Sequence, residues 1–201
     1  SKNIFKAFKM LDQDTVKILA DLSLTMFSKN FFGIYHGAIS TKQDEHSFMI
    51  NTRDAIFDRM DEKSFCSLNI NKQDYRWNIA SMESDIHATI YANIHEAKYI
   101  AFGMPIYTTA YTLNHNKIVL EDFFGKTTFG EISIYNPGDF STWYKRNALE
   151  ITKYLKESEN NIMIIKGIGT YVYDRDIHEL VKKIAILENS CRQKKKKSSF
   201  N

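Results

Sequence analysis

Short strand-like segments alternate with amphipathic helical segments along this chain of 201 residues, and that alternation limits the possible fold more than any other feature. Apolar residues recur at helical spacing in the helical segments, whereas the short segments are rich in β-branched and aromatic residues. The predicted helices are residues 14–30, 55–60, 80–93, 147–156 and 177–191. The predicted strands are residues 37–42, 47–52, 64–70, 98–102, 131–135, 162–165 and 171–173. Strands and helices mixed in this way predict one α/β domain.

Charge is unevenly distributed along the chain. The whole sequence has a net charge of +3, yet Arg192 and the four lysines at 194–197 alone contribute five positive charges. The remaining body is therefore slightly acidic, and residues 192–201 contain no acid. We predict a single folded domain over residues 1–191 and a basic, disordered tail over residues 192–201. A solvated end accounts for such a tail, and unspecific attraction to nucleic acid or anionic lipid is the alternative.

Composition excludes several classes of protein. No apolar run approaches the roughly 20 residues that a helix needs to cross a bilayer, so we expect no membrane-spanning segment. We also expect no secretory signal, because no apolar stretch follows the first charged residues. Cys66 and Cys191 lie far apart in the sequence, which argues against a disulfide scaffold or a cysteine-based zinc site. These features predict a cytoplasmic protein.

Four motifs in a fixed order give the chain a resemblance to a known family. They are GAIS at residues 37–40, SMESDIHATIY at 81–91, FGMP at 102–105 and KGIG at 166–169. The second motif keeps a Ser-x-Glu-x-x-x-His-x-x-x-Tyr spacing, and a strand and a final helix follow the fourth. In this order the segments resemble the class II aldolase/adducin head family, which includes fuculose-phosphate aldolases, over about residues 14–191.

The resemblance carries expectations about fold and partners. It implies a three-layer α/β sandwich, in which helices cover a central mixed or antiparallel sheet. It also implies a homo-oligomer, often a tetramer with sites between subunits, and a small sugar-phosphate-like ligand. It implies neither a membrane nor a specific nucleic acid as a partner.

The family's metal site is the feature in which this sequence departs most. Family members use three imidazoles to hold a divalent ion, usually zinc, which polarises the sugar carbonyl and stabilises the enediolate. By the resemblance, those ligand positions are Phe102, Met104 and Ile168 in this chain. Phe and Ile offer no lone pair, and a Met thioether suits Cu(I) rather than zinc. We therefore expect no metal cofactor and dry apolar packing at this point.

Glu83 is the family carboxylate that this sequence retains. The resemblance gives it the roles of metal-site neighbour and proton shuttle. Beside three apolar side chains it would be desolvated, which would raise its pKa and leave it competent as a general acid or base without a metal. The alternative is that Glu83 makes a structural hydrogen bond and that its helix is retained for the fold.

The phosphate-binding segments of the family are altered as well. The Asn of the family's Gly-Asn turn is Ala38, and Asp54 stands where a Gly would let the backbone approach an anion. Arg53 can supply one charge-assisted contact to a phosphate, or it is an exposed turn charge. The residues that we predict to bind a substrate are Gly37, Ser40, Arg53, Ser81 and Lys166.

Three functions remain open from the sequence. The first is a non-catalytic protein that acts by binding or assembly, as the adducin head does on the same fold. The second is a working sugar-phosphate aldolase, or a related epimerase or dehydratase, that holds zinc through other ligands. The third is a metal-independent proton-transfer enzyme that uses Glu83. The six histidines form no HxH or HExxH pair, which weighs against the second.

Overall fold

The computed structural model of the protein describes residues 11–33 and 36–200. The helices that it describes are α2 (Gln13–Ser28), α3 (Ser84–Asn93), α4 (Ile106–Thr112), α5 (Phe123–Thr128), α6 (Trp143–Glu157) and α7 (Ile177–Ser199). The strands are β1 (Ala38–Lys42), β2 (Ser47–Asn51), β3 (Phe65–Asn69), β4 (Tyr99–Gly103), β5 (Lys117–Val119), β6 (Glu131–Tyr135), β7 (Ile162–Ile165) and β8 (Gly169–Asp174). Among these helices, none has the length and apolar character that crossing a membrane requires.

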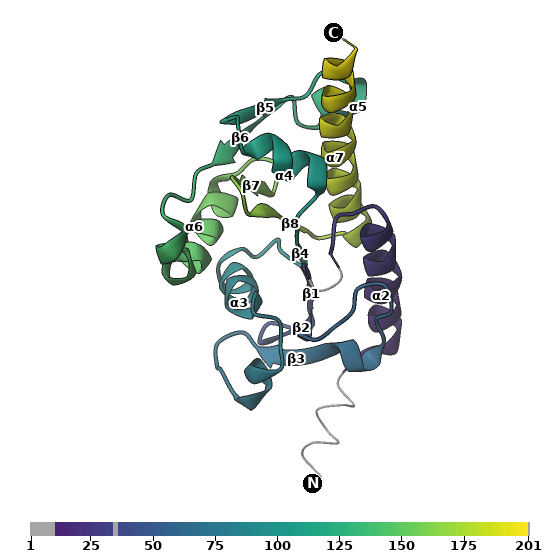
Figure 1. Cartoon of the computed structure of the whole chain (residues 1–201). Helices are drawn as coiled ribbons and strands as arrows, with labels where there is room; N and C mark the ends of the chain where they lie inside the picture. Colours follow the sequence, from purple (N-terminus) through teal and green to yellow (C-terminus); the bar gives the residue numbers. More distant parts are fainter. Residues whose placement is uncertain (1–10, 34–35, 201) are drawn as a thin grey trace.

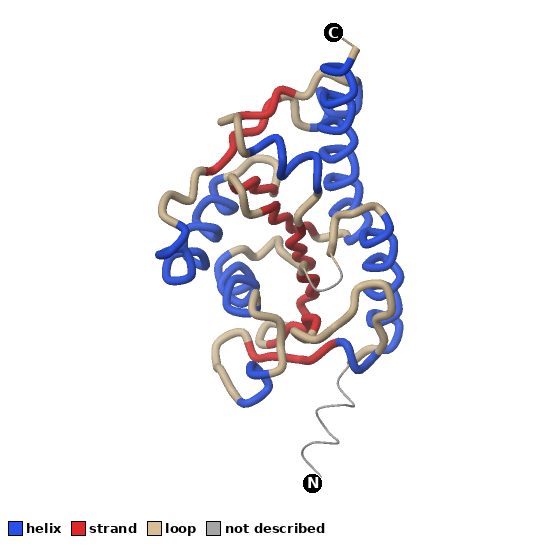
Figure 2. The backbone as a smooth tube through the Cα atoms, viewed as in Figure 1, coloured by secondary structure: helices blue, strands red, loops and turns tan. Residues whose placement is uncertain are grey.

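The strands of the described chain form one eight-stranded sheet in the order β3-β2-β1-β4-β8-β7-β6-β5. Neighbouring strands run antiparallel, except that β6 and β7 run parallel, so the sheet is mixed as predicted. Figure 2 shows the strands running in succession through the middle of the molecule. Because β4 lies between β1 and β8, Phe102 near the end of β4 has Ala38 beside it on one side and Tyr171 on the other.

Helices cover both faces of this sheet. In Figure 1, α2 and α7 lie on one face, and α3 and α6 lie on the other. Successive side chains of a strand point to opposite faces, which β4 illustrates. Ala101 joins the apolar cluster beneath α2 and α7, whereas Ile100 and Phe102 join the cluster beneath α3 and α6. The predicted three-layer α/β sandwich is therefore confirmed.

Two segments differ from the elements predicted between the long helices. Residues 55–60 form turns, so the helix predicted there is wrong. Phe57 is buried, and its ring centroid lies 4.6 Å from that of Phe32, so long-range packing rather than helical hydrogen bonding fixes this short segment. The short elements β5 and α5 lie outside the predictions. The side chain of Asp122 accepts a hydrogen bond from the Gly125 N–H at the start of α5, a capping signal that the sequence does carry.

The basic end of the chain continues α7 as far as Ser199, which contradicts the disordered tail predicted over residues 192–201. Lys, Arg and Gln favour helix, and contacts with the body of the domain support this part of α7. The Lys194 ammonium lies 5.7 Å from the centre of the Tyr111 ring. Lys194 and Lys197 both pair with Glu121, at 3.7 and 3.2 Å. Asn201 lies outside the described residues.

Candidate functional site

Ser81 fixes the position of Glu83 at the N-terminal end of α3. The Ser81 Oγ atom accepts a hydrogen bond from the Glu83 N–H at 3.2 Å, and the Ser84 hydroxyl donates to the Ser81 carbonyl at 2.6 Å. The Ser81 N–H donates to the carbonyl of Asn51, at the end of β2, at 2.9 Å. Ser81 thus forms a turn just before α3 and accepts the N–H of Glu83, the residue that precedes the first turn of the helix. The structure gives Ser81 this backbone contact, and a contact with phosphate stays a prediction.

The carboxylate of Glu83 meets a buried phenol. The hydroxyl of Tyr171, in β8, donates a hydrogen bond to Glu83 Oε2 at 2.5 Å. Burial raises the pKa of Glu83 to about 7, and the hydrogen bond from Tyr171 opposes that rise. Burial, reinforced by the adjacent carboxylate, also raises the pKa of Tyr171. Burial therefore shifts the pKa of Glu83 in the predicted direction, and near neutral pH the carboxyl group can either hold or release a proton.

Apolar side chains enclose the ring of Tyr171. Phe102 stacks on it with ring centroids 4.5 Å apart and an interplanar angle of 27°. A Cβ atom at Gly169 would lie 2.8 Å from the Phe102 ring, and Ile168 packs against the same apolar cluster. Of the three family ligand positions, Phe102 thus stacks on Tyr171, and Ile168 packs against the apolar cluster to which both rings belong. Met104 lies past the end of β4 and is 40% exposed.

The side chains at this site do not fit a zinc ion. The side chains of Phe102, Ile168 and Met104 supply no nitrogen or thiolate donor. The carboxylate of Glu83 already accepts a hydrogen bond from Tyr171. Within residues 11–33 and 36–200, no group of three or more His, Cys, Asp or Glu side chains is placed to hold a metal ion.

A second buried polar cluster joins β1 to α3. The Ser40 Oγ atom lies 2.6 Å from His87 Nδ1 and 2.8 Å from the Tyr91 hydroxyl. Both Ser40 and His87 are fully buried, and burial lowers the pKa of His87 to about 3, so the imidazole is neutral. Glu83, His87 and Tyr91 are spaced four residues apart and therefore lie along one face of this helical segment. His87 and Tyr91 contact Ser40, whereas Glu83 contacts Tyr171.

The hydrogen bonds of this second cluster indicate one tautomer of His87. The Tyr91 hydroxyl donates to the Lys98 carbonyl at 3.4 Å. Suppose that His87 Nδ1–H donates to Ser40 and that Ser40 donates to Tyr91. Every donor in this series of three hydrogen bonds then has an acceptor. His87 Nε2, which has no partner among the described residues, is then left only as an unused acceptor. The opposite tautomer would bury an unpaired N–H, which costs more free energy.

Gly37 and Arg53, two other residues predicted to bind a substrate, have close contacts with other parts of the chain. Gly37 has φ +144°, and a Cβ atom there would lie 2.5 Å from the Phe32 ring, so glycine is required by that close approach. Arg53 donates from Nε to the Ala80 carbonyl at 3.1 Å and from its guanidinium to the Trp77 carbonyl at 3.3 Å. Arg53 therefore lies beside the start of α3, whereas Gly37 precedes β1. Their roles in binding a substrate stay predictions.

Lys166 is tied to a different part of the molecule. Its Nζ atom donates to Asn116 Oδ1 at 3.0 Å, immediately before β5. The next residue, Gly167, donates its N–H to Thr112 Oγ1 of α4 at 3.0 Å. The structure thus brings Ser81 and Arg53 to the helix end that carries Glu83, and it joins Lys166 to the connection between α4 and β5.

Sequence reasoning did not single out Tyr171 as the partner of Glu83. The two residues are separated by 88 positions, and they meet because β8 pairs with β4 in one particular register. Tyr171 lies in the strand predicted after the fourth motif, and nothing in that strand pattern points to Glu83. The strand order and register of the central sheet were needed to find it.

Comparison with known proteins gives one family. The sequence matches the Class II Aldolase and Adducin N-terminal domain over residues 17–194. Among curated proteins, none matches the sequence significantly.

Solved structures show the same fold at low sequence identity. The chain is similar to L-fuculose-1-phosphate aldolase from Thermus thermophilus, with a TM-score of 0.81, 16% identity and coverage of 92% of this chain and 94% of that chain. It is similar to a sugar-phosphate aldolase from Thermotoga maritima, with a TM-score of 0.72, 12% identity and coverage of 94% and 96%. The N-terminal class II aldolase domain of a conserved Thermoplasma acidophilum protein gives a TM-score of 0.65, 12% identity and coverage of 91% and 94%. With the sequence match spanning most of the chain, this protein belongs to the class II aldolase and adducin N-terminal domain family.

Proposed function

We propose that this protein is a metal-free member of the class II aldolase family that acts by binding and assembly rather than by cleaving a carbon–carbon bond. The observation that carries the proposal is the stack of Phe102 on Tyr171, whose hydroxyl in turn binds Glu83. Aldol cleavage needs a positive group that stabilises the developing enediolate, and such stabilisation is usually the largest catalytic contribution. The side chains at the family ligand positions cannot supply it.

The ligand that we propose is a small sugar phosphate, bound without being cleaved. The Thermus thermophilus relative is named for a substrate of this class. Arg53 supports the proposal, because its guanidinium lies beside the start of α3 and remains exposed. The proposal places the protein in the cytoplasm, where phosphorylated sugars are abundant.

Self-assembly is the second part of the proposal. Phe123 and Phe124 in α5 are 75% and 64% exposed, and their rings contact each other edge to face with centroids 5.3 Å apart. Exposed aromatic pairs of this kind are typical of protein interfaces. We expect a homo-oligomer in solution, which sedimentation velocity can measure. A Phe123→Glu and Phe124→Glu double variant should dissociate it, whereas Leu149→Glu, at another exposed apolar position, should not.

Metal content tests the metal-free proposal directly. Protein purified without chelators should contain far less than one zinc per chain by elemental analysis. Finding one tightly bound zinc per chain would overturn the proposal, because the ligands would then have to lie elsewhere.

A restoring variant tests whether the family positions are correctly assigned. Phe102→His, Met104→His and Ile168→His together should create zinc affinity, because they return three imidazoles to these positions. A control with Ile79→His, Met82→His and Leu149→His adds the same number of imidazoles at exposed positions and should not. If the first variant folds, as circular dichroism would show, and still binds no more zinc than the control, the assignment is wrong.

One observation favours a second function, proton transfer by Glu83 without a metal. A carboxyl group with a pKa of about 7 is suited to exchange a proton near neutral pH. This function predicts that the protein catalyses deuterium exchange from solvent into dihydroxyacetone phosphate, observed by NMR. Glu83→Gln keeps the shape of the side chain and should abolish the exchange, whereas the binding function predicts no exchange in either protein.

A further inference from the structure

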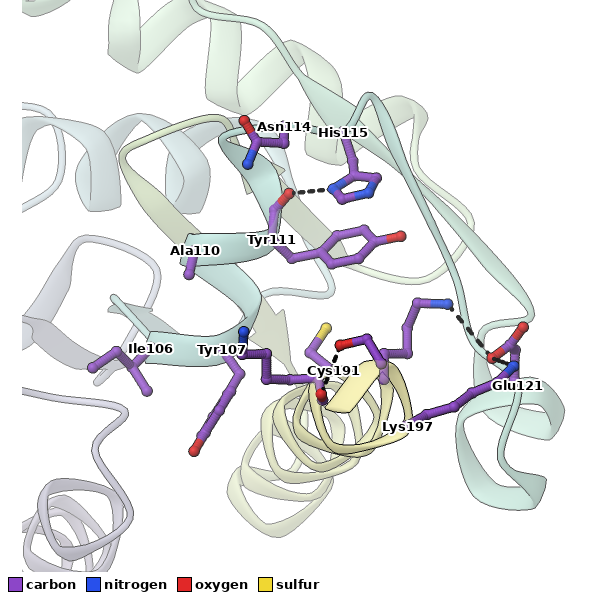
Figure 3. Close-up of a pocket in the computed structure, with 12 residues that line it drawn as sticks. Ile106, Tyr107, Ala110, Tyr111, Asn114, His115, Glu121, Cys191 and Lys197 are labelled. Atoms are coloured by element: carbon purple, nitrogen blue, oxygen red, sulfur yellow. Dashed lines mark hydrogen bonds and ion pairs between the residues drawn. The ribbon is translucent and has the colours of Figure 1, made fainter. Parts of the chain in front are cut away.

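A groove of about 690 Å³ lies between α4 and the C-terminal turns of α7, on the sheet face that α7 covers. Figure 3 shows α4 forming one wall and α7 the other, with the segment that carries Glu121 closing one end. Glu83 belongs to α3 on the opposite face. Phe102, Met104 and Ile168, the family ligand positions, do not line the groove either. The groove has the size of ordinary small-molecule sites.

Positive charge dominates the lining of this groove. Lys194, Lys195 and Lys197 line it together with one acid, Glu121, which leaves a charge of +2. Glu121 pairs with Lys194 and Lys197, and its hydrogen bond with Lys197 lowers its pKa, so it stays ionised. Lys195 has no ion pair within the part of the chain that the structure describes. Burial raises the pKa of Cys191 to about 11, so its thiol adds no negative charge.

The α4 wall of the groove is apolar and aromatic. Tyr107, Ala110 and Tyr111 contribute to it from successive turns, and His115 stacks on Tyr111 with ring centroids 3.7 Å apart. Ala110 is exposed, so its small side chain leaves the middle of this wall open. A ligand that fits both walls therefore needs an anionic group and an apolar body.

A buried carboxylate holds the two walls together. Glu188 of α7 accepts hydrogen bonds from the N–H groups of Tyr107 and Thr108 at 3.1 and 2.8 Å, and from the Thr108 hydroxyl at 3.0 Å. These bonds lie one turn before Cys191, which itself lines the groove. The distance between the walls is thus fixed by the fold, so the groove exists before any ligand arrives.

We propose that this groove binds a phosphate monoester with an aromatic or apolar body. The phosphate lies among the lysines of α7, and the body lies on α4 beside Ala110. A phosphate monoester carries a charge of about −1.5 to −2 near neutral pH, which matches the +2 of the lining. Its oxygens accept the charge-assisted hydrogen bonds that lysine ammonium groups donate.

Phenyl phosphate is the simplest probe of this proposal, because it combines the two features of the ligand. Isothermal titration calorimetry on the full chain should show binding of phenyl phosphate. Inorganic phosphate, which lacks the body, and phenol, which lacks the charge, should each bind at least about tenfold more weakly, since each forms only one of the two sets of contacts. Equal affinities for phenyl phosphate and inorganic phosphate would overturn the proposal.

Matched charge variants separate the groove from general attraction to a basic helix. Lys195→Gln should weaken binding of phenyl phosphate about tenfold, which corresponds to the loss of one charge-assisted contact. Lys196→Gln removes the same charge from the next position of α7, which does not contribute to the described lining, and should change the affinity less than about twofold. Equal losses in the two variants would overturn the proposal.

Two variants of α4 test the body of the ligand. Ala110→Trp should block the open part of the wall and abolish binding of phenyl phosphate. Ala110→Glu should also abolish binding of phenyl phosphate, because its charge repels the phosphate. Glu is well tolerated at an exposed helix position, so this variant keeps the test valid if Trp at position 110 disturbs the fold. Unchanged binding in a folded variant would overturn the proposal. The proposal would also be overturned if a single-stranded oligonucleotide bound more tightly than phenyl phosphate and if neither α4 variant changed its affinity. That result would indicate a surface for polyanions.

Discussion

Glu83 and Glu121 show how one kind of side chain acquires opposite properties in two regions of the molecule. Glu83 is half-buried at the start of α3, and its carboxylate accepts a hydrogen bond from the Tyr171 phenol. It forms no ion pair with a residue that the structure describes, and its pKa is raised. Glu121 is exposed, pairs with two lysines of α7, and has a lowered pKa. In the first region, burial and a neutral donor surround the carboxylate. In the second, charge has gathered at the surface, and it is there that an anion would find cations not fully neutralised.

The largest effect that we expect is on packing in the first region. Phe102→Ala should lower the free energy of unfolding by about 3–5 kcal/mol, because it removes a buried ring that stacks on Tyr171 and leaves a cavity. Leu149→Ala, at a side chain that is 73% exposed, should change it by less than about 0.5 kcal/mol. Chemical denaturation measures both. A loss at Phe102 no larger than the loss at Leu149 would mean that this region is an open pocket.

The next effect concerns the dependence of stability on pH. The pKa of Glu83 is about 7 in the folded protein and about 4.3 in an unfolded chain, so ionisation favours the unfolded state. The contribution of Glu83 to stability is complete below pH of about 4 and is lost as the pH rises to about 7. The free energy of unfolding should therefore fall by about 3 kcal/mol more in the wild-type protein than in Glu83→Gln between pH 4.5 and 8. Parallel pH profiles would contradict the raised pKa.

A smaller effect should follow from removing the phenol oxygen. Tyr171→Phe keeps the stack with Phe102 and deletes the donor to Glu83, so we expect a loss of about 1 kcal/mol in the free energy of unfolding. The pKa of Glu83 should rise further, because this hydrogen bond lowers it. Carbon-detected NMR of the Glu83 carboxyl group measures that pKa. A pKa that falls in this variant would show that Tyr171 does not stabilise the ionised carboxylate.

The smallest effect on stability should come from the second region. Glu121→Gln removes an exposed acid, and exposed ion pairs contribute little, so the melting temperature should hardly change. The same variant frees Lys194 and Lys197, and it should strengthen binding of phenyl phosphate about threefold. Weaker binding would indicate that Glu121 holds the lysines in place rather than competing for them.

The sequence predicted the elements of the sheet well because each strand has a local signal. Alternating or fully apolar runs between helical segments identified β1 to β4 and β6 to β8, and the family resemblance supplied the three layers. The segment at 55–60 was predicted wrongly because Phe57 packs against a residue distant in sequence, which no local pattern reports. The tail was predicted as a disordered, solvated end because residues 192–201 contain only basic charges, and the local sequence does not show that Tyr111 and Glu121 contact the lysines there.

The candidate site was predicted in part. A desolvated Glu83 was expected from the apolar residues at the family ligand positions; burial does raise its pKa, and the contact that the structure gives its carboxylate is with Tyr171. The partner of Glu83, Tyr171, depends on strand register and was not predicted. The cluster of Ser40 with His87 and Tyr91 shows the same limit: the spacing on α3 placed two of its members on one face, but only the fold reveals what that face covers.

The three hydrogen bonds that Glu188 accepts across α4 have a practical consequence for engineering this protein. A stop codon placed after Cys191 would delete the lysine-rich turns of α7 and keep these three hydrogen bonds. The shortened protein should therefore still fold, and it would serve as a control that lacks the lysine wall of the groove. A stop codon after Leu187, one turn earlier, would remove Glu188 and leave the Tyr107 and Thr108 N–H groups of α4 without their acceptor. The boundary between a dispensable end and an indispensable one therefore falls within a single turn of α7.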